Sequence, residues 1–118
     1  INQSKRMGKL FSEYSIPIDS VYSSQWCRCK ETARLAFGNF ESLSALNSTF
    51  AADYQKNHSK QMSELHQFIK NWDDSQGNLI FVTHYVIVGG FLDYYPSSGE
   101  MVIIDKSLSV LGSIKINF

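Results

Sequence analysis

The stretch from Asn78 to His84 constrains the fold of this chain more than any other. Residues 79–83 are all apolar or β-branched, and the Gly77-Asn78 pair in front of them is a turn signal. This pattern is typical of a strand buried on both faces of a parallel sheet. The strand ends at His84. Because ligands of open α/β sheets bind beyond the carboxyl ends of the strands, His84 is a candidate functional residue.

A second strand-to-helix unit lies earlier in the chain. Residues 20–23 predict a short strand, and a helix over residues 25–37 follows directly, with Ser24 as its expected cap. Arg28 falls in the first turn of this helix, where backbone N–H groups and the helix dipole favour an anion. If the two strands are parallel neighbours, Arg28 and His84 share one pocket at the same edge of the sheet. The competing hypothesis is that Arg28 pairs with Glu31 or Glu13 on the surface.

Periodicity elsewhere in the sequence completes an alternating pattern. We expect helices over 3–14, 58–72 and 85–95, strands over 101–104 and 110–118, and a loop with one helical turn over 40–57. Alternating elements of this kind predict an α/β fold with a mainly parallel sheet flanked by helices. The last two strands predict a C-terminal antiparallel hairpin at one side of the sheet. We expect residues 1–118 to form a single domain.

Composition excludes several classes of partner. Eleven basic residues balance eleven acidic ones, so no general field attracts nucleic acid or an anionic membrane, and an anion site must be local. No apolar run approaches the roughly 20 residues that span a bilayer. We therefore expect a soluble protein, with the cytoplasm favoured as its compartment. Cys27 and Cys29 stand too close together on a helix to bridge, and they have no companion pair for a metal site.

Two short motifs resemble one known family. Residues 21–33, VYSSQWCRCKETA, look like the SSxxxRxxxTA segment of the histidine phosphatase superfamily, also called phosphoglycerate mutase-like. Residues 79–84 resemble the same family's vVtH segment, and Ser98-Gly99-Glu100 resembles its SGE. The order and separation of the first two segments also fit the family, and the likeness covers nearly the whole chain.

This resemblance implies a phosphoglycerate mutase-like fold and a hydrolase activity. The complete protein would be a phosphomonoesterase that works through a phosphohistidine intermediate, with no metal and no cofactor. Arg28, Ser24 and His84 would bind the phosphate of a small phosphorylated substrate, or phosphate itself. His84 would also be catalytic, because it stabilises the charge of the transferring phosphoryl group.

The departures from the family pattern concern its catalytic groups. The family's nucleophile is the His of an Arg-His-Gly triplet, which this sequence lacks. The general acid is also displaced, since Tyr85 and Asn47 stand where family branches place an Asp or a Glu. Glu100 is then the best remaining proton donor, and its alternative is a solvated turn residue. His58 and His66, at the start and in the middle of an amphipathic helix, are expected to be solvated.

The missing triplet leaves two hypotheses about function. Either an upstream strand supplies the nucleophile and the protein is a phosphatase, or the chain is a non-catalytic phosphate-binding or scaffold module. A third is an α/β domain with no anion site. Because the chain begins at Ile1 with a helix already in progress, we expect the domain to be N-terminally incomplete. The sheet should then have an open slot, which an upstream strand or a second copy in a homodimer would fill.

Overall fold

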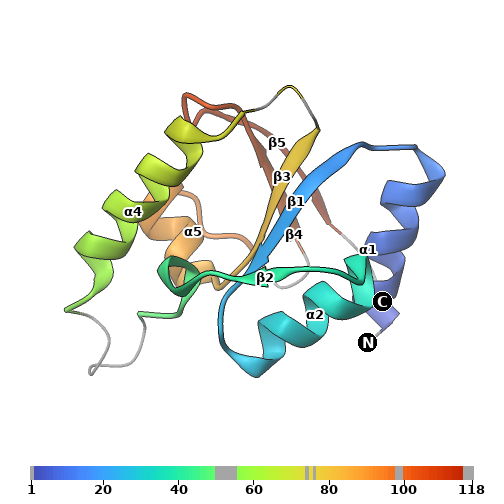
Figure 1. Cartoon of the computed structure of the whole chain (residues 1–118), viewed down its shortest axis with the longest axis horizontal. Coiled ribbons are helices and arrows are strands. Elements are labelled where there is room, and N and C mark those ends of the chain that lie inside the picture. Colours follow the sequence, from blue (N-terminus) through green and yellow to red (C-terminus); the bar gives the residue numbers. More distant parts are fainter. Residues whose placement is uncertain (1, 50–55, 74, 76, 98–99, 116–118) are drawn as a thin grey trace.

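A computed structural model describes residues 2–49, 56–73, 75, 77–97 and 100–115. Helices and strands alternate along most of it, as the sequence predicts, and the α/β class is confirmed (Figure 1). The elements in order are α1 (Asn2–Glu13), β1 (Ile18–Ser23), α2 (Cys27–Phe37), β2 (Glu41–Ser42), the 3₁₀ turn η1 (Ser44–Leu46), α4 (His58–Asn71), β3 (Asn78–Val82), α5 (Tyr85–Leu92), β4 (Glu100–Ile104) and β5 (Val110–Lys115).

The first sheet is parallel and has β1 at its centre. Its strand order is β2-β1-β3, and β1 pairs with β3 so that Ser23 faces Val82. The pairing continues one residue further, because the N–H of Ser24 donates to the carbonyl of Val82 at 2.9 Å. The carboxyl ends of β1 and β3 therefore meet at the same edge. At Tyr22 and Ser23, β1 has a neighbour from this chain on both sides, so the expected open slot is not found there.

The hairpin forms a sheet of its own. β4 and β5 are antiparallel, which confirms the predicted pairing, but this two-stranded sheet is separate from the first one. Within the described residues, the hairpin therefore does not extend the parallel sheet by hydrogen bonding. A register shift between Ile103 and Ile104 interrupts the pairing.

Two pairs of helices cover the parallel strands. In Figure 1, α4 and α5 lie on one side of them and α1 and α2 on the other. A buried cluster of Ala45, Leu46, Leu65 and Ile87 lies on the α4 side, and Cys29 and Ala33 of α2 are buried on the other side. On the same side, the rings of Tyr22 and Phe68 meet edge to face with centroids 4.8 Å apart. On the other side α1 and α2 approach so closely that a Cβ on Gly8 would lie 1.9 Å from the carbonyl oxygen of Ala36.

Several boundaries differ from the sequence prediction for local reasons. β1 begins at Ile18 instead of residue 20, because Ile18 pairs with Asn78. α2 begins at Cys27 with Trp26 as its N-cap, so Ser24 is not the cap. α5 ends at Leu92 because Asp93 adopts a left-handed conformation with φ of 55°. The segment predicted as a loop over 40–57 contains β2 and η1, and its residues 50–55 lie outside the described part of the chain.

Candidate functional site

The structure brings Ser24 and His84 together at the carboxyl edge of the parallel sheet. Ser24 follows β1, and His84 follows β3 as the N-cap of α5. The hydroxyl Oγ of Ser24 lies 2.9 Å from Nε2 of His84. Ser24 is fully buried, so its hydroxyl is held by its neighbours and has no room to attack a substrate. It therefore positions the imidazole.

Asn47, at the end of η1, organises the same edge. Its Oδ1 lies 3.2 Å from Oγ of Ser24 and accepts from the backbone N–H of Gln25 at 2.7 Å. Its Nδ2 donates to Oε1 of Gln25 at 2.9 Å. The hydroxyl of Ser24 also accepts from the N–H of Trp26 at 3.1 Å. The family resemblance aligned Asn47 with the Glu of one family branch, but periodicity gave no reason to place it here, because it lies in an aperiodic segment 23 positions from Ser24.

Cys29 also lies beside the imidazole. Its Sγ lies 3.6 Å from Nε2 of His84 and 3.6 Å from the carbonyl oxygen of Thr83. Burial raises the pKa of the Cys29 thiol, so the thiol stays neutral and is a poor nucleophile. Cys27 is exposed, and both cysteines are free, in agreement with the predicted absence of a disulfide.

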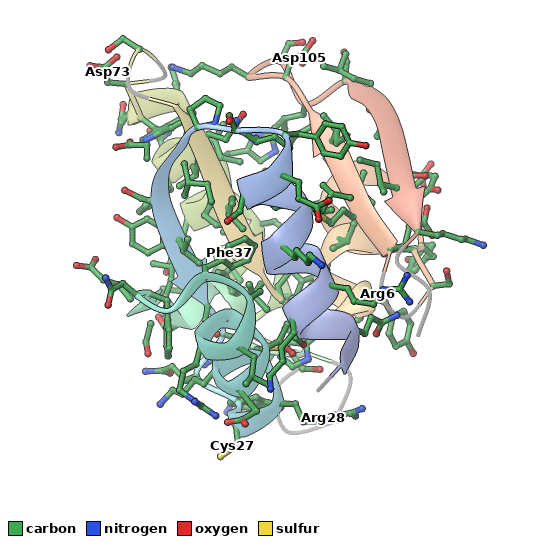
Figure 2. The ribbon with its side chains drawn as sticks, turned by 90° about the vertical axis from the view of Figure 1, so that its right-hand side faces the viewer. Arg6, Cys27, Arg28, Phe37, Asp73 and Asp105 are labelled. Atoms are coloured by element: carbon green, nitrogen blue, oxygen red, sulfur yellow. The ribbon has the colours of Figure 1, made fainter. Side chains whose placement is uncertain are left out.

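Arg28 lies beside this cluster with its side chain exposed to solvent. Figure 2 shows Arg28 and Cys27 at the same end of the molecule, pointing away from the ribbon. Neither of the expected surface partners holds Arg28, because Glu31 pairs with Arg34 and Glu13 with Lys9. Within the described residues, no ion pair includes Arg28. The structure thus places Arg28 near His84 but outside contact with it.

The imidazole of His84 is neutral at physiological pH. Burial lowers its pKa from the usual 6.5, and the positive charge of Arg28 lowers it further. The ring of Trp26 lies edge to face with that of His84, with centroids 6.1 Å apart. A neutral imidazole can donate from one nitrogen and accept at the other. The site therefore offers a hydrogen-bonding group of fixed orientation and a nearby cation, Arg28, that has no ion-pair partner among the described residues.

Glu100 does not join this cluster. It accepts hydrogen bonds from the hydroxyl of Tyr94 and from the N–H of Ser97 at 2.9 Å. These bonds lower the pKa of Glu100 to about 2, led by the bond from Tyr94. At neutral pH the carboxyl group is ionised and has no proton to give, so this geometry does not support Glu100 as a general acid.

The other two histidines have structural surroundings. Nδ1 of His58 lies 2.8 Å from Oγ1 of Thr49, and a Cβ on Gly90 would meet the His58 ring. The prediction that His58 is solvated is therefore wrong, since the residue is half-buried. His66 is exposed, as predicted, with its ring at 4.8 Å from that of Phe91. Across the residues that the structure describes, no group of three His, Cys, Asp or Glu side chains is placed to hold a metal ion. In the same part of the chain, no helix combines the length and hydropathy of a membrane span.

The comparisons with known proteins point away from phosphatases. The chain is similar to N-acetyl-gamma-glutamyl-phosphate reductase of Halalkalibacterium halodurans, with 36% identity over 66 residues. The matched residues are 55% of this chain and 19% of the relative. The match therefore spans about a fifth of the relative's length. No family model matches the sequence.

These findings overturn membership of the histidine phosphatase superfamily. The predictions of a phosphoglycerate mutase-like protein, a phosphohistidine intermediate and a phosphomonoesterase or hydrolase activity are wrong. The alternative drawn from the same resemblance, a non-catalytic phosphate-binding or scaffold module that has lost its nucleophile, is wrong as well. The physical reason is that both motifs lie where a parallel strand turns into a helix. Small hydroxyl residues and a histidine at such turns serve the geometry of many α/β folds, so their spacing does not specify one family.

Proposed function

We propose that this chain is part of a reductase-type enzyme and binds the phosphoryl group of a small phosphorylated substrate. The observation that carries the proposal is the 2.9 Å contact between Ser24 and His84, which joins the ends of two adjacent parallel strands where α2 begins. The similarity to a reductase that is named for a phosphorylated compound supports the same class of ligand.

The charges around this edge favour an anion. In the first turn of α2, the N–H of Cys29 donates to the carbonyl of Trp26, which leaves the N–H groups of Cys27 and Arg28 to face an anion at the helix N-terminus. Arg28 in that turn offers a guanidinium group, which matches a phosphoryl group with two parallel hydrogen bonds. Because the chain carries no net charge, this local arrangement is the source of the attraction. Arg28 would swing in from solvent as the ligand binds.

The proposal does not extend to the reductant. A dinucleotide requires a glycine-rich turn between a strand and a helix, so that the backbone approaches the pyrophosphate. The β1–α2 turn of this chain is Ser24-Gln25-Trp26, and the β3–α5 turn is Thr83-His84, with no glycine in either. These turns do not fit such a cofactor, and we derive no hydride-transfer step from this chain.

We also propose a cytoplasmic location. Two cysteines stand two positions apart and are both free, which suits a reducing compartment. Labelling of intact cells with a membrane-impermeant thiol reagent tests this, because the exposed Cys27 reacts only if it faces the outside.

Titration of the ¹⁵N-labelled chain with inorganic phosphate and with acetyl phosphate tests the binding proposal. We expect saturable shifts of the backbone amides of Ser24, Cys27, Arg28 and His84. Arg28→Ala should weaken binding roughly 10-fold to 100-fold, as for loss of charge-assisted hydrogen bonds worth about 1.5–3 kcal/mol. Lys30→Ala, on the same helix, is the matched control and should bind as the wild type does. Amides at this edge that do not respond to either anion would overturn the proposal.

A further inference from the structure

Two polar atoms in hydrogen-bonding contact with Nε2 of His84 determine which ring nitrogen carries the proton. They are Oγ of Ser24 at 2.9 Å and Sγ of Cys29 at 3.6 Å. A hydroxyl and a thiol can each donate or accept, so distances alone leave the tautomer open. The tautomer follows from the acceptors to which the Ser24 hydroxyl and the Cys29 thiol donate their own protons.

The hydroxyl of Ser24 donates its hydrogen bond to Asn47. The backbone N–H of Gln25 donates to Oδ1 of Asn47 at 2.7 Å, which fixes the amide with its oxygen toward Ser24. The bond from Nδ2 of Asn47 to Gln25 Oε1 fixes the same orientation from the other side. Since an amide oxygen only accepts, Ser24 must donate to it across 3.2 Å. The hydroxyl then has only a lone pair left for His84.

The thiol of Cys29 also donates its proton to an acceptor other than His84. Sγ donates to the carbonyl oxygen of Thr83 at 3.6 Å, and a carbonyl oxygen only accepts. Cys29 also offers a lone pair to the imidazole. If Nε2 carried no proton, its lone pair would face the lone pairs of Ser24 Oγ and Cys29 Sγ. If Nε2 carries the proton, both neighbours can accept from it.

We propose that Asn47, acting through the Ser24 hydroxyl, is a positioning residue that holds His84 as its Nε2–H tautomer and leaves Nδ1 as the acceptor for a ligand. Within the described part of the chain, no hydrogen bond reaches Nδ1 of His84. The site then recognises a ligand O–H or N–H donor next to the phosphoryl group, or the P–OH of a phosphoryl monoanion. This statement about the ligand rests on the proposed function, whereas the tautomer does not.

Long-range ¹H–¹⁵N correlation spectra of the imidazoles, recorded without ligand at a pH where His84 is neutral, test the tautomer. We expect the wild type to show Nε2–H at His84. Asn47→Ala should give a mixture of tautomers, because Ser24 is then free to donate to Nε2. Asn47→Asp keeps an acceptor oxygen and should restore Nε2–H. His58→Gln and His66→Gln assign the signals.

Three outcomes would overturn this role of Asn47. They are Nδ1–H in the wild type, an unchanged tautomer in Asn47→Ala, and loss of Nε2–H in Asn47→Asp. Should Asn47→Ala fail to fold, Asn47→Leu removes the acceptor oxygen and keeps most of the side-chain volume, with the same expected result.

Addition of inorganic phosphate separates the two proposals. We expect the Nδ1 resonance of His84 to move while Nε2 keeps its proton. Amide shifts at Ser24 without a change at Nδ1 would overturn the ligand half of the inference and leave phosphate binding supported. No response anywhere would overturn the proposed function, and the ligand-free spectra would still decide the role of Asn47.

Discussion

At the scale of single residues, the site depends on the ionisation of His84. Burial and the charge of Arg28 both favour the neutral imidazole, and the bonds of Ser24 and Cys29 orient it. Arg28 is exposed and acts on the His84 pKa through its charge. A substitution of Arg28 therefore changes the electrostatic part of the His84 pKa shift and leaves the burial of the ring unchanged.

Arg28→Ala should raise the pKa of His84 toward its ordinary value. Removal of a nearby positive charge makes the protonated imidazole less unfavourable, while the burial of the ring is unchanged. An NMR titration of the His84 ring protons measures this. Lys30→Ala is the control for loss of a positive charge on the same helix, and it should leave the His84 pKa nearer to the wild-type value. A pKa that falls in Arg28→Ala would contradict the prediction.

The lowered pKa of His84 also makes stability depend on pH. The unfolded chain takes up this proton near pH 6.5, and the folded chain only at lower pH. The stability that His84 contributes is therefore present above pH 6.5 and is lost as the pH falls through its folded pKa. Urea unfolding of the wild type and His84→Gln, between neutral pH and about pH 5, isolates this contribution, because other groups titrate in both. We expect the wild type to lose more stability than the variant across this range, and parallel curves would disprove the link.

At the scale of elements, the crossing of α1 over α2 depends on the absence of a side chain at Gly8. A Cβ there would lie 1.9 Å from the carbonyl oxygen of Ala36, which is backbone and cannot rotate away. Alanine favours a helix by about 1 kcal/mol over glycine, whereas overpacking costs about 1–3 kcal/mol. The cost of the contact between the new Cβ and the Ala36 carbonyl should therefore exceed the gain in helix propensity.

Gly8→Ala should therefore lower the free energy of unfolding by up to about 2 kcal/mol, against the direction of helix propensity. Chemical denaturation monitored by circular dichroism measures the change. Ser12→Ala, at an exposed position of the same helix, is the control and should change stability by no more than about 0.5 kcal/mol. A more stable Gly8→Ala would mean that the two helices move apart at little cost.

The sequence predicted the elements that have a strong period or a continuous apolar run. β3 has an apolar run over residues 79–82, all of them half-buried, and α4 shows the spacing of a helix with one apolar face. β2 has only two residues, so it leaves no pattern. Periodicity could not assign Asn47 to the site, because its place depends on how η1 packs rather than on its neighbours in sequence, and the resemblance pointed to it only as a replacement for a family acid. The family resemblance failed for the related reason that it rested on strand-to-helix turns shared by many folds.

At the scale of the whole molecule, the core belongs to the parallel sheet and its helices. The buried cluster of Ala45, Leu46, Leu65 and Ile87 packs against Tyr22 of β1 and Phe81 of β3. No residue of β4 or β5 is buried, and Leu111 is 65% exposed. Lys106 ties the hairpin turn to the rest by donating from Nζ to the carbonyl of Trp72 at 2.6 Å. The hairpin should therefore open locally without global unfolding.

Hydrogen exchange should separate these two parts of the molecule. We expect amides of β1 and β3 to exchange only on global unfolding, and amides of β4 and β5 to exchange faster through local opening. Leu65→Ala removes a side chain that is 1% exposed and should cost about 2–5 kcal/mol of global stability. That loss should speed exchange in β1 and β3 and leave β4 and β5 unchanged, because local opening does not disturb the core. Leu111→Ala is the control in the exposed strand and should leave β1 and β3 as they are. Equal acceleration of both sheets by Leu65→Ala would show instead that the hairpin and the core unfold as one unit.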